Sequence, residues 1–351
     1  MIKSPIAIRV DGSFKRGMGH IVRMLSIARE LSDNQIPSIF IMKPFKEGYN
    51  IIQKAGFPIY LINEDYDESI DGIDLIKRIL SDAGSKIIIN DVQGTSHNYM
   101  ISLKRYGYFT INIDDIGKGA RLADVLIDAF IPQDKTCEKL YRFFGMDYLI
   151  LRDEFFKNRP STLRPDVKKI CVMPGGTNAG KMMEKVIGWL SSLNKQYELY
   201  VMTGAGVDND SAIYSDHNNS VIMVSDWNGV PDILADCDLS IASGGISMCE
   251  SCTVGIPTIA IAQVKHELNN INLLSSKQAV FSMGYIKDLK KEVFLEAFKR
   301  IEKSYEYRSI LAEKGKKAVD GKGKERIINI IKRFYQDICT SKDMLLKIAV
   351  N

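Results

Sequence analysis

Residues 170–190 read ICVMPGGTNAGKMMEKVIGWL, which is an apolar run, a turn with adjacent glycines and then a helical pattern. The same order occurs near the N-terminus, where residues 6–33 read IAIRVDGSFKRGMGHIVRMLSIARELSD. A strand that ends in a glycine turn before a helix is typical of the first part of a parallel α/β unit. Because this pattern occurs twice, the sequence predicts two domains of the same type.

Short β-rich runs alternate with helical segments in both halves of the chain. Several runs are almost continuously apolar, as expected of parallel strands that are covered on both faces. We expect strands at 6–10, 38–42, 58–62, 86–90, 109–113, 124–128, 169–173, 198–202, 221–225, 238–242 and 258–262. The segment 19–33 has one apolar helical face, formed by Ile21, Met24, Leu25, Ala28 and Leu31. The predicted fold class is α/β, with two Rossmann-like, doubly wound domains that face each other across a cleft.

A break in periodicity separates the two halves. Residues 156–168 carry two prolines and several polar residues, which predicts a linker. We expect an N-terminal domain at 1–155, a C-terminal domain at 169–325 and a C-terminal helix or tail at 326–351. In parallel sheets ligands bind beyond the carboxyl ends of the strands, so the loops that follow strands are the candidate sites.

The composition is that of a globular protein, with 45% hydrophobic and 26% charged residues among 351. No apolar run approaches the roughly 20 residues that span a bilayer, and we interpret the apolar N-terminal run as a first strand and not a signal peptide. We therefore expect a cytoplasmic protein without a membrane span. Lys and Arg exceed Asp and Glu by four, and the basic C-terminal segments lack interleaved aromatic residues. Nucleic acid is therefore not an expected partner, whereas anionic small molecules are.

The six cysteines show no disulfide-framework spacing. Cys249 and Cys252 form a lone CxxC, which is compatible with redox chemistry or half of a zinc site. Without a second pair, reduced cysteines that pack in the core are the favoured interpretation.

The loop after the first predicted strand contains Asp11, Gly17, Gly19 and His20. Glycines before a helix allow a ligand to approach the backbone, and a helix N-terminus favours an anion. The dinucleotide fingerprint GxGxxG fails, because Val22 stands in place of its third glycine. The helix dipole favours neutral imidazole at His20, which could act as a base near pH 7. The structural alternative is a histidine that caps or packs at the turn.

The loop after the strand 169–173 nearly matches a P-loop, through Gly175, Gly180 and Lys181. Met182 occupies the position whose hydroxyl would hold Mg²⁺, so an NTPase is disfavoured. A glycine turn that lines a ligand site is favoured instead, with candidate contacts from Gly175, Gly176, Thr177 and Asn178.

The third candidate loop is Ser243-Gly244-Gly245, between a strand and a helix. Small residues at a helix start let backbone amides meet a diphosphate. Glu250 lies about two turns further along, where a carboxylate could hydrogen-bond ribose hydroxyls. The structural alternative is an ordinary βαβ unit with an exposed glutamate.

Further polar residues follow or flank these elements. Asp114 and Asp115 lie at a strand end, where they could position a sugar, orient a base or cap a turn. Arg16 and Arg23 flank the His20 loop and could contact a diphosphate. For Arg23, a salt bridge on the helix surface is the favoured interpretation.

Metal chemistry has little support in the sequence. DxD patterns at 65–67 and 208–210 fall in polar loops, and the chain has four histidines without HExxH. There is no GxSxG nucleophile elbow. We therefore expect no metal and no cofactor.

Taken together, six segments resemble the spore coat polysaccharide biosynthesis protein G family. They are RVDGSFKRGMGHIVRM, DDIGKGARLADVLID, MPGGTN, IASGGISMCESCTVGIP, QVKHE and AVDGKG. This family is similar to the UDP-sugar hydrolase of the pseudaminic-acid pathway. Both belong to the GT-B superfamily, which includes the peptidoglycan GlcNAc transferase. The resemblance covers most of the chain, from about residue 6 to residue 323.

The resemblance implies a two-domain GT-B fold that binds UDP through its C-terminal half and the sugar near the N-terminal loop. His20 would be the catalytic base, and Asp11 would be a second catalytic residue that contacts the sugar or orients the loop. Gly17 and Gly19 would shape the pocket around His20. Asp115 would belong to the substrate site.

On the nucleotide side, the resemblance implies that Glu250 binds the ribose. The diphosphate would be bound by Ser243, Gly244, Gly245 and Ser247. The hydrolase has an Asn-Gln pair where this chain has His266-Glu267, so substrate contacts at these two residues are expected with a different chemistry.

The leading functional hypothesis is hydrolysis of a UDP-linked 2,4-diacetamido-2,4,6-trideoxyhexose type of sugar, which serves nonulosonic acid or surface polysaccharide synthesis. Water activated by His20 would attack the anomeric carbon and release UDP. The alternative is a UDP-sugar-dependent glycosyltransferase, in which an acceptor sugar replaces water. A third hypothesis is a nucleotide-sugar-binding subunit without catalysis.

Overall fold

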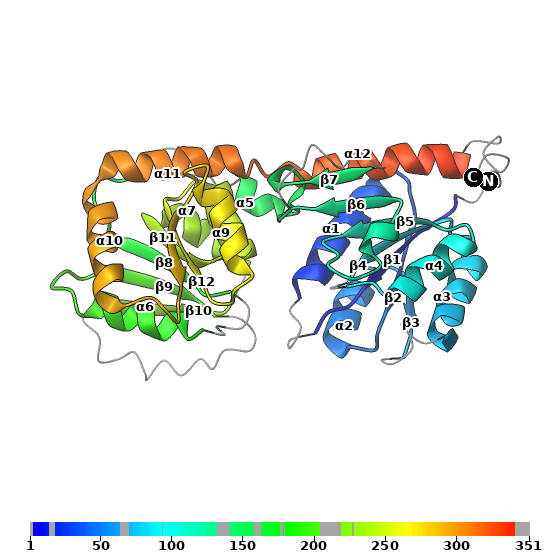
Figure 1. Ribbon diagram of the computed structural model, residues 1–351, viewed down its shortest axis with the longest axis horizontal. Coiled ribbons are helices and arrows are strands. Elements are labelled where there is room, and N and C mark those ends of the chain that lie inside the picture. Colours follow the sequence, from blue (N-terminus) through cyan, green and yellow to red (C-terminus); the bar gives the residue numbers. More distant parts are fainter. Residues whose placement is uncertain are drawn as a thin grey trace. The chain divides into compact units, whose positions relative to one another are not determined.

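The computed structural model describes residues 3–13, 18–63, 70–92, 94–131, 141–157, 163–175, 178, 180–203, 219–226 and 228–340. The chain divides into two compact units, of which unit 1 comprises residues 1–150 and 322–351 and unit 2 comprises residues 151–321. Each unit contains a parallel sheet with helices packed against it (Figure 1). The expected division at 155, 169 and 325 differs from these bounds chiefly because the last helix belongs to unit 1.

Unit 1 has a sheet of order β3-β2-β1-β4-β5-β6-β7, in which all described neighbours are parallel. The strands are β1 (Ile6–Val10), β2 (Ser38–Met42), β3 (Ile59–Leu61), β4 (Ile87–Asp91), β5 (Phe109–Ile113), β6 (Val125–Asp128) and β7 (Arg142–Phe144). The order reverses between β1 and β4, and in open parallel sheets the loops after two such strands are the usual place for a ligand site.

The helices of unit 1 cover both faces of this sheet. They are α1 (Gly19–Asp33), α2 (Lys46–Lys54), α3 (Ile70–Asp82), α4 (His97–Arg105) and α12 (Gly323–Tyr335), with short 3₁₀ turns at Ala120–Leu122 and Met146–Tyr148. Because side chains alternate along a strand, Ile6 and Ile8 join the core under α1 and α12, whereas Ala7 joins the core under α3 and α4.

The helix α12 completes the first of these cores. Ile327 and Ile331 are fully buried beside residues of α1, and the Tyr335 hydroxyl donates to the Ser4 carbonyl at 2.8 Å. Gly323 begins the helix against Leu149, since a Cβ at this position would lie 2.1 Å from the Leu149 carbonyl oxygen. A π-helical turn, Gln336–Thr340, follows α12.

Unit 2 has a sheet of order β10-β9-β8-β11-β12-β13, again parallel among the described strands. The strands are β8 (Lys169–Met173), β9 (Glu198–Met202), β10 (Ser220–Val224), β11 (Leu239–Ser243), β12 (Thr258–Ala262) and β13 (Phe281–Tyr285). The helices are α5 (Asp153–Lys157), α6 (Met182–Ser191), α7 (Val230–Asp236), α8 (Ile246–Val254), α9 (Glu267–Ser275), α10 (Lys291–Lys303) and α11 (Tyr305–Ala318). Its order reverses between β8 and β11, as unit 1 does between β1 and β4.

The structure confirms all eleven predicted strands, each to within one residue at either end. It adds β7 and β13, which sequence reasoning missed. Both are edge strands, and all of their residues are half-buried, so neither shows the continuous apolar run of a central strand. The amphipathic prediction for α1 is also confirmed, since all five predicted face residues are buried.

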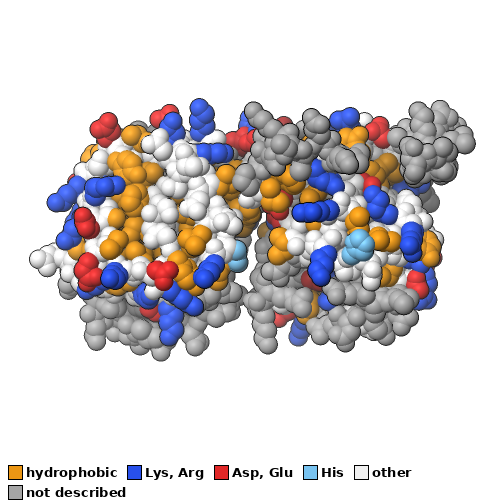
Figure 2. Space-filling model, in the orientation of Figure 1, with side chains coloured by type: hydrophobic (Ala, Val, Ile, Leu, Met, Phe, Trp, Pro, Cys, Tyr) orange, Lys and Arg blue, Asp and Glu red, His pale blue; other side chains and the backbone are white. Residues whose placement is uncertain are grey.

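On the visible surface of the described residues, Lys and Arg side chains are interspersed with Asp and Glu side chains and with uncharged atoms (Figure 2). No helix in the described part of the chain has both the length and the apolar composition to cross a membrane.

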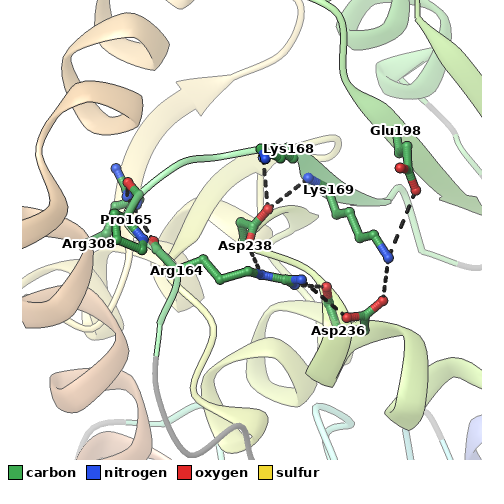
Figure 3. A network of polar contacts seen from close by, with 8 residues as sticks. All are labelled: Arg164, Pro165, Lys168, Lys169, Glu198, Asp236, Asp238 and Arg308. Atoms are coloured by element: carbon green, nitrogen blue, oxygen red, sulfur yellow. Dashed lines mark hydrogen bonds and ion pairs between the residues drawn. The ribbon is translucent and has the colours of Figure 1, made fainter.

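A buried polar network ties the segment before β8 to the sheet of unit 2 (Figure 3). The Asp238 carboxylate accepts hydrogen bonds from the backbone amides of Lys168 and Lys169, both at 2.8 Å, and from Arg164 Nε at 2.5 Å. Arg308 is 1% exposed and donates to main-chain carbonyls, including that of Arg164 at 3.2 Å. Buried polar groups must be paired, so this network fixes the path of the chain into the sheet.

We expect Asp238→Ala to lower the free energy of unfolding of unit 2 by about 3 kcal/mol, because it leaves two buried amides and a guanidinium without their acceptor. The matched control is Asp236→Ala, whose carboxylate also pairs with Arg164 but is 57% exposed. An exposed pair contributes less than about 1 kcal/mol. Urea unfolding followed by tryptophan fluorescence reports this unit, since Trp189 and Trp227 both belong to its range. Equal losses in the two variants would contradict the assignment.

Candidate functional site

In unit 1, His20 lies in the first turn of α1, as predicted, at the carboxyl edge of the sheet. Its Nδ1 lies 2.8 Å from Oδ1 of Asp91, the last residue of the neighbouring strand β4. The His20 side chain is 34% exposed, whereas the Asp91 side chain is fully buried. The imidazole ring is therefore bound to the protein through Nδ1, and part of the ring is exposed to solvent.

Arg23 lies one turn after His20 on the same helix and contacts the same carboxylate. Its Nε donates to Asp91 Oδ2 at 2.7 Å, its Nη2 donates to Asp91 Oδ1, and its Nη1 donates to Asp114. The predicted salt bridge is confirmed, but the predicted surface location is wrong, because the side chain is 13% exposed. The guanidinium is turned away from the helix surface because it pairs with the carboxylates of Asp91 and Asp114.

The charge state of Asp91 determines whether Nδ1 of His20 donates or accepts the hydrogen bond between them. Burial would raise the pKa of Asp91, but Arg23 and His20 outweigh it and hold the pKa below its usual value. An ionised carboxylate only accepts hydrogen bonds, so Nδ1 of His20 donates to Asp91, and in the neutral ring the lone pair is on Nε2. This arrangement lets Nε2 accept a proton from a bound hydroxyl group.

The other predicted acidic residues of unit 1 are engaged inside the protein. Burial would raise the pKa of Asp11, but Arg9, which is 2.7 Å away, and the Lys43 amide lower it. Asp115 is 4% exposed and accepts from Thr95 Oγ1 at 2.6 Å and from Asn112 Nδ2 at 2.5 Å. These contacts favour the loop-orienting alternative for Asp11, and substrate contact by Asp115 stays a prediction.

Of the two predicted glycines of the His20 loop, Gly19 is among the described residues and Gly17 is not. Gly19 begins α1, and a Cβ there would meet no atom within 4 Å. Gly17 and Arg16 lie outside the described residues, so their predicted roles stay predictions.

In unit 2, β11 ends at Ser243, and the Gly244-Gly245 turn leads into α8, as predicted. Glycine is required at position 244 because Glu267 packs closely against it, and a Cβ there would lie 2.8 Å from the Glu267 Cβ. Ser243 and Ser247 are buried at the start of this turn and helix.

Glu250 is the buried acidic residue of α8, with 7% exposure. The alternative of an exposed glutamate is therefore wrong. Burial raises the pKa of Glu250 to about 7, against the opposing charge of Arg152. Its carboxylate accepts no hydrogen bond from the described part of the chain. A buried carboxylate without such a partner is a candidate ligand contact.

The loop after β8 lies against the loop after β11. Gly175 has φ +80°, and a Cβ there would lie 2.9 Å from the Ser243 hydroxyl. Asn178 lies before α6 and contacts its first turn, since its Oδ1 accepts from the Met183 amide at 3.1 Å. Gly176 and Thr177 lie outside the described residues.

Gln263 and Glu267 join the loop after β12 to these loops. Gln263 Oε1 accepts from the backbone amide of Gly180 at 3.0 Å. The backbone amide of Gln263 donates to the Glu267 carboxylate at 2.7 Å. Burial raises the pKa of Glu267, although the amides of Gln263, Val264 and Gly244 oppose the shift. His266 precedes α9 directly and has no capping side-chain hydrogen bond.

Sequence reasoning missed the roles of Asp91 and Gln263 and the buried position of Arg23. Asp91 carried a signal, since it ends an apolar strand where ligand-site residues gather. Arg23 also carried one, since residues three apart share a helix face.

The remaining sequence motifs are structural or lie outside the described residues. Cys249 and Cys252 are buried, which confirms their packing role, and burial raises the pKa of Cys252 to about 12. Met182, at the failed P-loop position, is fully buried. Both DxD patterns fall outside the described residues, and the residues that are described contain no cluster of three or more metal-binding side chains.

No family model matches the chain. Across 94% of its length it is 24% identical to the spore coat polysaccharide biosynthesis protein SpsG of Bacillus subtilis, of which the match covers 98%. It is 26% identical to the uncharacterized protein MJ1062 of Methanocaldococcus jannaschii, over 74% of the chain and 55% of that protein.

Solved structures resemble the chain over nearly its whole length. MurG of Acinetobacter baumannii has a TM-score of 0.68 at 15% identity, over 94% of this chain and 99% of its own. The calicheamicin glycosyltransferase CalG4 has a TM-score of 0.68 at 12% identity, over 97% and 100%. UDP-GlcNAc 2-epimerase of Neisseria meningitidis, bound to UDP-GlcNAc, has a TM-score of 0.59 at 12% identity, over 93% and 100%. The chain therefore has the predicted GT-B fold.

The raised pKa of Glu250 predicts a pH-dependent stability. Between pH 4.5 and about 7 the folded protein binds this proton more tightly than the unfolded chain, so burial of Glu250 costs stability as the pH rises. We expect Glu250→Gln to stabilise unit 2 at pH 8 by on the order of 2 kcal/mol, and to have no such effect near pH 4.5. Urea unfolding at both pH values measures this, with Glu296→Gln, an exposed site on α10, as the control. A pH-independent difference would contradict the prediction.

Proposed function

We propose that this chain is a nucleotide-sugar-dependent glycosyltransferase that acts in the synthesis of a cell-surface polysaccharide. The observation that carries the proposal is the His20–Asp91 pair at the carboxyl edge of unit 1, in which Nδ1 of a 34% exposed imidazole lies 2.8 Å from a buried carboxylate. The GT-B fold, the named role of SpsG in polysaccharide biosynthesis and the glycosyltransferase CalG4 support it. These likenesses favour transfer over the hydrolysis that the sequence analysis placed first.

In the proposed reaction, Nε2 of His20 removes the proton from an acceptor hydroxyl group while its oxygen attacks the anomeric carbon of the donor sugar. The bond between that carbon and the phosphate oxygen breaks, and its electron pair leaves with the nucleoside diphosphate. Asp91 stabilises the imidazolium that forms, and the proton then passes to solvent. Water in place of the acceptor would give hydrolysis by the same step.

We assign nucleotide binding to unit 2. The Ser243-Gly244-Gly245 turn and Ser247 would bind the diphosphate through backbone amides and hydroxyl groups. Glu250 would accept hydrogen bonds from the ribose, which provides the partner that its carboxylate lacks within the described protein. UDP is the proposed nucleotide, by the resemblance noted above and by the UDP-GlcNAc-bound epimerase.

The loops after β8 and β12 would support this site. Gly175 brings the first loop close to Ser243, and Asn178 holds the start of α6. Glu267 is proposed to hold Gly244 in place, and His266, directly before it, is proposed to face the sugar.

The first test of the proposal is a donor screen. We expect the purified chain to release UDP from one or more UDP-sugars, including amino-deoxy sugars, only when a hydroxyl-bearing acceptor is present. Coupled detection of UDP with and without a panel of saccharide acceptors measures this. Equal release without any acceptor would favour hydrolysis, and tight UDP binding without turnover would support a binding subunit.

The second test addresses the base. We expect His20→Gln to lower kcat by about 10²- to 10⁴-fold, because proton removal from the nucleophile is lost. The control is His97→Gln, since His97 is exposed at the start of α4. UDP release at saturating donor measures both variants. Full turnover by His20→Gln would overturn the catalytic assignment.

A further inference from the structure

Arg23 connects three polar groups that come from separate parts of unit 1. Its guanidinium meets Asp91 at the end of β4 through two nitrogens and Asp114 after β5 through the third. Its Nη2 also lies 3.1 Å from Nδ1 of His20. A two-point contact between Arg and a carboxylate fixes the carboxylate plane as well as its position.

The Asp91 carboxylate depends on this cation. Its side chain is fully buried, and a buried charge without a counter-charge is strongly destabilising. Nη2 of Arg23 can only donate, so it does not compete for the Nδ1 proton, which the carboxylate accepts at 2.8 Å. Arg23 therefore keeps Asp91 ionised and aimed at His20 without itself bonding to the imidazole.

Asp114 holds Arg23 from the other side. Asp114 has a left-handed backbone with φ +47°, and its Oδ1 accepts from the Ala129 amide at 3.2 Å. This conformation separates it from Asp115, which is directed into the buried contacts with Thr95 and Asn112. The first aspartate of the pair serves the His20 cluster, and the second anchors its own loop.

We propose that Arg23 is the positioning residue of the His20 site, and that its fork between Asp91 and Asp114 holds the Asp91 carboxylate in the orientation that sets the His20 tautomer. The expected effect of Arg23 on turnover rests on the function proposed above. Its effect on the Asp91 orientation and on the His20 tautomer does not depend on any substrate. Arg23 acts through Asp91 and contacts no reacting atom in this proposal.

The substrate-free experiment is nitrogen NMR of the full chain labelled with ¹⁵N-histidine. The chain has four histidines, and the His20 signals are identified by their loss in His20→Gln. In the unmodified protein we expect the pattern of a single tautomer with the proton on Nδ1. In Arg23→Gln we expect that pattern to be lost, because Asp91 without its cation either turns away or changes its protonation. Arg29→Gln, at an exposed position of the same helix, should leave the pattern unchanged.

Arg23→Gln leaves a buried carboxylate unpaired and could unfold unit 1, so Arg23→Lys is the second variant. It retains the charge but cannot span Asp91 and Asp114 with one ammonium group. With an active donor and acceptor, we expect Arg23→Lys to lower kcat by about tenfold and Arg23→Gln by about 10²-fold. The KM of the donor should not change, since no donor contact is removed.

The outcomes separate this proposal from the proposed function. An unchanged His20 pattern in folded Arg23→Gln, or full kcat with an unchanged pattern in Arg23→Lys, would overturn the positioning role. A lost pattern in a protein that turns over no donor would support the positioning role and contradict the glycosyltransferase. A purely structural Arg23 would lower stability in both variants while leaving the tautomer and kcat of the folded protein unchanged.

Discussion

Unit 1 is organised around a carboxylate that has no access to water. Asp91 ends β4, its side chain is fully buried, and it stays ionised because Arg23 and His20 both reach it from the first turns of α1. These two residues are three apart, so they share one face of α1, and both contact the carboxylate at the end of β4. One buried carboxylate thus binds both His20 and Arg23 in the first turns of α1. The strand reversal between β1 and β4 creates the place where this contact occurs.

In unit 2, hydrogen bonds connect the loops at the carboxyl edge of the sheet. Gln263 and Glu267 connect the loops after β8, β11 and β12 through backbone amides, so the turn at Gly244 is held without a ligand. Glu250 is the contrasting case, since burial raises its pKa and the described residues give its carboxylate no hydrogen bond. Arg152 offsets part of the cost of this burial, and buried carboxylates that accept no hydrogen bond from the protein are candidate ligand contacts.

Much of the fold followed from local pattern. The predicted strands and the helix 19–33 agree with the structure because apolar runs and helical periodicity depend on residues that are close in the chain. The edge strands β7 and β13 were missed because a half-buried strand lacks a continuous apolar run. The helix α12 was assigned to a separate tail, since no feature of its own sequence says which core it joins.

Only part of the candidate site could be predicted from residues that are close in the chain. The position of His20 in a first helical turn and the glycine turn before α8 could be predicted, because strand, turn and helix are contiguous there. The partners of His20 and Arg23 could not, since Asp91 lies 71 residues from His20 and Asp114 lies 91 from Arg23. Burial of Glu250, the engagement of Asp115 and the inward turn of Arg23 likewise depend on neighbouring elements. Residue types and their spacing thus determined which elements form and which loops carry polar residues. The packing of distant strands decided which of those residues meet, because burial and charge pairing act between groups that only the folded chain brings together.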